Sequence, residues 1–116
     1  MQIHWNLPLR IISEPNTNQH WSVRYKRAKE QKRCVWAAFY NEQPDIKLPC
    51  EVVLTRNAPR KLDDDNLIAS FKAIRDEIAD HLIPGLRPGM ADSSPAIAWH
   101  YKQNKSKEYS IDIEIV

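Results

Sequence analysis

The chain has 116 residues, of which 42% are apolar and 28% are charged, and its formal net charge at pH 7 is +2. This length favours one domain, residues 1–116, with a modest apolar core. No apolar run approaches the roughly 18 residues of a membrane span and nothing resembles a signal peptide, so we expect a cytoplasmic protein without a membrane partner. Cys34 and Cys50 lack metal-ligand spacing and are expected to stay reduced.

Charge is distributed unevenly along the chain. Residues 1–60 carry ten Lys and Arg against five Asp and Glu, whereas residues 61–116 carry seven against ten. A basic half beside an acidic half is typical of a protein that binds phosphates with one part and a cation with the other. Scatter of the charges without function is an equally good explanation at this point.

The first predicted elements are a strand and a long helix. Gln2–Leu9 alternates weakly between apolar and polar residues and predicts a strand that ends near Pro8. Residues 18–41 have helical periodicity. The expected inward stripe is Trp21, Ala28, Val35, Ala38 and Phe39. Cations and aromatic residues alternate near the start of this helix, which favours phosphate contacts with stacking; a solvated basic face is the alternative.

A second strand and a second helix follow. Glu51–Thr55 is a short β-branched run and predicts a buried strand, after which a loop carries Arg56, Arg60 and Lys61. Apolar residues then recur at helical spacing, which predicts a helix over Asp64–Ile83 that ends at Pro84. The stripe consists of Leu67, Phe71, Ile74, Ile78 and Leu82.

Three adjacent carboxylates, Asp63, Asp64 and Asp65, stand where the second helix begins. Two unit charges about 4 Å apart repel each other by about 1 kcal/mol in bulk water and by about 4 kcal/mol at an effective dielectric constant of 20. Either the acids cap the helix, for which one Asp is sufficient, or they hold a divalent cation. Spacing alone leaves both alternatives open.

The last part of the chain predicts two strands. Asp92 precedes Ala96–Lys102, which alternates as a strand, and residues 103–106 form a hairpin-like turn. Glu108–Val116 then alternates isoleucines with polar residues, as a half-buried strand does. The resulting order, β-α-β-α-β-β, predicts an α+β fold with a mixed sheet of about four strands and two helices packed on it.

One combination of motifs resembles a known family. The segment Asp63–Ile68 reads Asp-Asp-Asp-Asn-Leu-Ile and is followed by Lys72-Ala73-Ile74 and by the isolated Asp92. This arrangement resembles the RusA-like endodeoxyribonucleases, phage-associated Holliday junction resolvases with an Asp-x-Asp-Asn motif at a helix start, a helical lysine and a later Asp. Pro15–Trp21 is also similar to the Pro-x-x-Asn-x-x-aromatic segment of the family. The resemblance spans nearly the whole chain.

The resemblance implies a catalytic set of Asp63, Asp65, Asp92 and Lys72. The three carboxylates are expected to converge on Mg²⁺, because this cation prefers a few carboxylates together with waters and phosphate oxygens. Lys72 is expected to hold the scissile phosphate or to stabilise charge in the transition state. Asp64 is expected to cap the helix, and Asp76 is a weaker candidate for orienting Lys72.

The resemblance implies that the substrate is branched or four-way DNA. It also implies a homodimer, in which two symmetric active sites cut the two strands. The residues expected to bind DNA are Asn18, Trp21, Arg24, Lys26, Arg27, Arg56, Arg60 and Lys61. Two alternatives stay open: a nucleic-acid-binding protein of the same fold without catalysis, and a small protein-interaction module whose acids only cap and solubilise.

Overall fold

The computed structural model describes residues 2–12, 20–87 and 90–116. The elements are β1 (Ile3–Leu7), α1 (Trp21–Glu42), β2 (Cys50–Ala58), α2 (Asp64–Ser70), α3 (Lys72–Leu82), the 3-10 helix η2 (Ala91–Ser93), β3 (Ile97–Lys105) and β4 (Ser110–Ile115). The α+β class predicted from the sequence is confirmed. None of the helices within these ranges combines the length and the apolar character needed to cross a bilayer.

The four strands form one mixed sheet in the order β1-β4-β2-β3. β4 pairs antiparallel with both β1 and β2, whereas β2 pairs parallel with β3. The hairpin-like turn predicted for residues 103–106 is therefore wrong, because β3 continues to Lys105 and lies on the opposite side of β2 from β4. Every second residue of β4 is a fully buried isoleucine, and an interior position gives such a strand more cover than an edge does.

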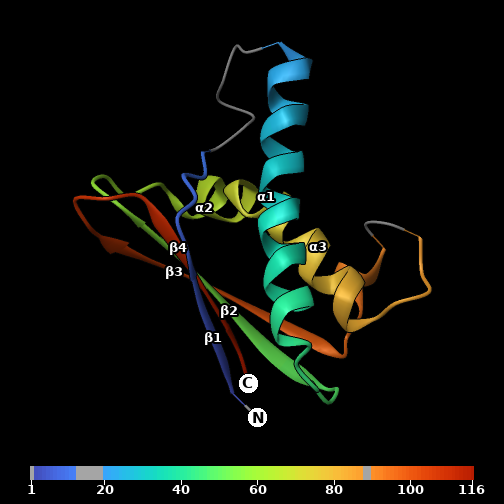
Figure 1. The fold of residues 1–116 in the computed structure, drawn as a ribbon. Helices are drawn as coiled ribbons and strands as arrows, with labels where there is room; N and C mark the ends of the chain where they lie inside the picture. The colour runs from blue at the N-terminus through green and yellow to red at the C-terminus, as the bar shows by residue number, and fades with distance from the viewer. Residues whose placement is uncertain (1, 13–19, 88–89) are drawn as a thin grey trace.

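The helices cover one face of the sheet. Alternate residues of the strands are buried on that face, and Val35 and Phe39 of α1 pack onto them. The rings of Trp5 and Phe39 meet edge to face, with their centroids 4.8 Å apart. α1 and α3 cross on this side of the sheet (Figure 1), and the start of β1 lies beside the end of β4, where Ile3 is paired with Ile115.

The helix predicted over Asp64–Ile83 is divided at Phe71 into α2 and α3. The Ser70 hydroxyl donates to the Leu67 carbonyl at 2.6 Å, and the Phe71 amide donates to the Ile68 carbonyl at 3.1 Å. Such short-range bonds tighten the last turn and bend a helix. The bend leaves the Phe71 ring fully buried and makes Lys72 the first residue of a new helix.

The other face of the sheet carries a polar network around Asp112 of β4. Its carboxylate accepts hydrogen bonds from Asn57 at 2.7 Å and Asn6 at 2.9 Å, and it contacts His4 Nε2 at 3.1 Å. Burial raises the pKa of Asp112, but these three partners together outweigh burial and leave the pKa below its ordinary value. The network links β1, β4 and β2 across the uncovered face.

This network predicts a pH-dependent contribution to stability. Because the pKa of Asp112 is lower in the folded than in the unfolded chain, its stabilisation is complete above about pH 4 and is lost as the pH falls through the folded value. Asp112→Asn should lower the free energy of unfolding by about 1–2 kcal/mol at pH 7. Urea denaturation should find this difference much smaller near about pH 2. Glu114→Gln, on the same face of β4, is the matched control; an equal loss at both pH values would contradict the prediction.

Candidate functional site

The acids at the start of α2 are placed by the capping of that helix. Asp63 has extended backbone, and its Oδ1 accepts a hydrogen bond from the Asn66 amide at 3.1 Å. Asp63 is therefore the N-cap, and the prediction that Asp64 takes this role is wrong. Asp64 and Asp65 follow in the first turn, where exposed carboxylates interact favourably with the helix dipole.

Asp92 lies in η2 and is held by Arg75 of α3. The Nε of Arg75 forms an ion pair with Asp92 Oδ2 at 3.2 Å, and Nη2 donates to the Asp92 carbonyl at 3.0 Å. The same guanidinium donates to the Tyr101 hydroxyl at 2.7 Å and lies over the ring of Trp99. The Trp99 indole also donates to the Asp92 carbonyl, at 3.0 Å. The carboxylate of Asp92 is therefore held by α3, and its backbone carbonyl is held by α3 and β3.

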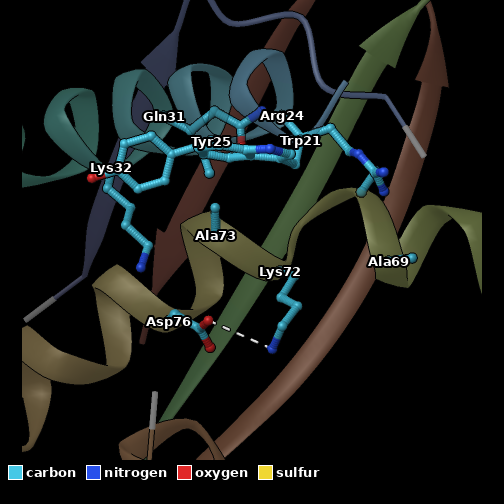
Figure 2. Close-up of a pocket in the computed structure, with 11 residues that line it drawn as sticks. Trp21, Arg24, Tyr25, Gln31, Lys32, Ala69, Lys72, Ala73 and Asp76 are labelled. Atoms are coloured by element: carbon cyan, nitrogen blue, oxygen red, sulfur yellow. Dashed lines mark ion pairs between the residues drawn. The ribbon is translucent and has the colours of Figure 1, made fainter. Parts of the chain in front are cut away.

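Lys72 and Asp76 form an ion pair one helical turn apart on α3, with Nζ and Oδ2 separated by 3.6 Å (Figure 2). The lysine is exposed, whereas Asp76 is buried and its Oδ1 has no hydrogen-bond partner among the described residues. Burial raises the pKa of Asp76, Lys72 and Lys32 lower it, and the negative charge of Asp92 raises it. Asp76 and Asp92 are thus close enough for their charges to interact.

These carboxylates are suited in their chemistry to a hard divalent cation. Mg²⁺ is commonly held by one or two carboxylates plus waters and phosphate oxygens, and Asp76 supplies an unpartnered oxygen next to the charge of Asp92. In the ranges 2–12, 20–87 and 90–116, however, no three His, Cys, Asp or Glu side chains are grouped for metal binding. Asp63 caps α2 and Asp92 pairs with Arg75, so each of these two carboxylates has a protein partner. Their convergence with Asp65 on Mg²⁺ stays a prediction.

The basic residues predicted to bind DNA divide into accessible and inaccessible groups. Arg24, Lys26, Arg60 and Lys61 are exposed, and Arg27 is half-buried. Arg56 is only 7% exposed, and its Nη1 donates to the Arg60 carbonyl at 2.7 Å. Burial lowers the pKa of Arg56. The expectation that Arg56 reaches a phosphate is corrected, because its guanidinium anchors the loop before α2 instead. Asn18 lies outside the described residues.

Trp21 opens α1 and is 67% exposed. Its prediction as part of the inward stripe is wrong, because α1 buries Gln31, Val35 and Phe39 instead. His20 caps the helix by accepting a hydrogen bond from the Ser22 amide, and its ring lies 5.3 Å from that of Trp21. The exposed position of Trp21 leaves its ring available to a ligand, as the predicted DNA contact requires.

A groove of about 590 Å³ separates the first half of α1 from α2 and α3 (Figure 2). Its walls combine aromatic, cationic and small residues, and Lys72 and Asp76 lie along one side. From the sequence, Tyr25 was expected only as part of the stretch of alternating aromatic and basic residues, and Gln31 and Lys32 had no predicted role in a site. Tyr25 was detectable, since a residue four positions after Trp21 shares its helix face. Gln31 and Lys32 carried no such signal, because only the packing of α3 against α1 makes them line a groove.

No protein-family model matches the chain, and no curated protein shows significant sequence similarity to it.

Proposed function

We propose that this protein is a Mg²⁺-dependent endodeoxyribonuclease that cuts branched DNA such as four-way junctions. The observation that carries the proposal is the position of Lys72 and Asp76 at the side of a groove that also presents Trp21 and Arg24. A DNA strand held there would have Lys72 beside its phosphate and Trp21 beside a base. The carboxylate of Asp76 lies in the same groove. The resemblance of Asp63–Asn66, Lys72 and Asp92 to the RusA-like motifs points to the same chemistry.

Each residue has a proposed part. Lys72 binds the scissile phosphate, and its pairing with Asp76 keeps the ammonium group at the start of α3. Asp92, which Arg75 holds in position, contributes a metal ligand together with Asp63, Asp65 or the unpartnered oxygen of Asp76. When bound, Mg²⁺ would supply an activated water and neutralise charge on the leaving oxygen. Two symmetric cuts require two such sites, so the proposal includes a homodimer.

The test uses a labelled synthetic four-way junction and a linear duplex of the same sequence, each with Mg²⁺ and with EDTA. We expect paired nicks near the branch point only with Mg²⁺, and far weaker cleavage of the duplex. Asp65→Asn should abolish the nicks without loss of fold, because Asp65 is exposed. Asp45→Asn, an exposed carboxylate in the loop after α1, is the matched control and should cleave normally.

A second candidate function is DNA binding without catalysis. It is favoured by the pairing of Asp92 with Arg75 and of Lys72 with Asp76, which satisfies groups that a catalyst would use. In that case the protein would retain the junction at low salt, where phosphate contacts are strongest, but would leave it intact with Mg²⁺. That outcome would replace the nuclease proposal with the binding proposal.

A further inference from the structure

The groove between α1 and α3 has the dimensions of a small-ligand site. Its volume of about 590 Å³ lies within the range of about 300–1,000 Å³ that is usual for pockets that bind small molecules. The small residues Ala28, Ala69 and Ala73 also line it. Figure 2 shows Ala69 and Ala73 on the wall that faces α1. A group of the size of one nucleotide therefore fits this volume, whereas a stacked duplex is far larger than it.

Two aromatic residues on the α1 wall expose most of their surface. Trp21 is 67% exposed and Tyr25 is 62% exposed, and they are four residues apart on one helix face. Large apolar rings left in water at the mouth of a groove are typical of a binding surface. Stacking on a nucleobase would cover these rings, and it tolerates any base because every base has a π-face.

The polar residues of the groove complement a phosphate and a base edge. Arg24 and Lys32 project from α1 and Lys72 from α3, so cations stand on both walls (Figure 2). Three buried polar residues line the groove, Gln31, Ser70 and Asp76. The Ser70 hydroxyl donates to the Leu67 carbonyl, whereas Asp76 Oδ1 has no partner within the described ranges. Three cations against one carboxylate give the groove a net positive charge, which suits a singly charged phosphodiester.

We propose that this groove binds one unpaired nucleotide of the DNA substrate, with its base stacked on Trp21 and Tyr25 and its phosphate held by Arg24, Lys32 and Lys72. The proposal rests on the proposed function, because it assumes that DNA is the ligand of this surface. It goes further in naming the substrate feature: a branch point at which a base is unpaired, or can be displaced from its stack. A base pair inside a continuous duplex cannot enter, since both of its faces are already stacked.

The test measures binding of the full chain in EDTA, so that no cleavage occurs. The probes are two fluorescein-labelled three-way junctions that differ at one unpaired position beside the branch, which carries either a thymine or an abasic site. We expect the wild-type protein to bind the thymine junction about tenfold more tightly, as stacking of one base would give. The double variant Trp21→Ala/Tyr25→Ala should reduce this ratio to about one, Trp21→Ala alone should lower it, and Trp21→Phe should keep part of what Trp21→Ala loses.

The control is Trp36→Ala, which removes another exposed tryptophan of α1 that does not line the groove. It should keep the full ratio. Equal affinity of the wild-type protein for both junctions, or a full ratio that survives in Trp21→Ala/Tyr25→Ala, would overturn the proposal. The result can be separated from the nuclease proposal. If the protein does not cleave DNA but still prefers the thymine junction, only the nuclease proposal fails. If it cleaves with Mg²⁺ but binds both junctions equally, only the nucleotide site is excluded.

Discussion

Replacing Lys72 with alanine should lower the rate of junction cleavage by at least about 100-fold, as does removal of one group that stabilises transition-state charge in other enzymes. The affinity for the junction should change by no more than about fivefold, because an exposed ionic contact contributes at most about 1 kcal/mol. The ammonium group is exposed at the start of α3 and has Asp76 as its partner at 3.6 Å. Cleavage rates at saturating protein, with separate affinity measurements in EDTA, distinguish the two effects.

Two further variants make the Lys72 prediction specific. Lys107→Ala removes an exposed lysine between β3 and β4, outside the groove, and should cleave at the normal rate. Lys72→Arg keeps the positive charge with a different geometry and should recover part of the rate. The thermal unfolding midpoint should hardly change in Lys72→Ala, since the lysine side chain is 78% exposed. A normal cleavage rate in Lys72→Ala would remove this residue from the catalytic set.

Replacing Phe71 with alanine should lower the free energy of unfolding by about 3–5 kcal/mol, the usual range for loss of a buried aromatic side chain. Phe71 is fully buried at the junction of α2 and α3, and its ring centroid lies 6.0 Å from that of Tyr101 on β3. Since domains of this size are commonly stable by only about 5–15 kcal/mol, the change is a large part of the total. Urea denaturation followed by circular dichroism measures it.

The Phe71 prediction has a matched pair of controls. Phe71→Leu should lose much less stability, because leucine refills most of the volume. Ile68→Ala, an exposed position one turn earlier on α2, should change the free energy of unfolding by less than about 0.5 kcal/mol. If Phe71→Ala and Ile68→Ala unfold at the same urea concentration, Phe71 does not have the packing role that its burial indicates.

The strand and helix pattern was predictable because local periodicity decides it. β4 alternates buried isoleucines with half-buried polar residues, as its sequence indicates. The break at Phe71 was not predictable, because the apolar stripe continues through it: Leu67, Phe71 and Ile74 are all buried. Apolar residues that recur every 3.6 positions indicate which side of a helix faces the core. They do not indicate whether the helix bends between two of its turns.

Strand pairing was the weakest part of the fold prediction. A short polar turn between β3 and β4 is compatible with a hairpin, and nothing local indicates that β2 lies between them. The relative burial of the two strands was the usable signal. β3 exposes most of its alternate residues and lies at the sheet edge, whereas β4 has Ile111, Ile113 and Ile115 fully buried in the interior.

The candidate site was predictable as a set of residue types and only partly as a geometry. Sequence spacing identified the acids at the helix start, Lys72 and Asp92. It could not link Asp92 with Arg75, because the ion pair joins residues 17 positions apart across a loop. Nor could it show that Arg56 is buried, since its position after a strand is equally compatible with an exposed loop. Long-range packing decides both.

The position of β4 has a consequence for the order in which the protein can form. Among the residues that the structure describes, β1 pairs with β4 alone, and β4 is the second neighbour of β2 beside β3. On the ribosome, β2 and β3 can pair before β4 is made, but β1 has no described partner strand until residues 110–115 have left the exit tunnel. The helices can form earlier, so nascent chains should stay accessible to chaperones until translation reaches this strand.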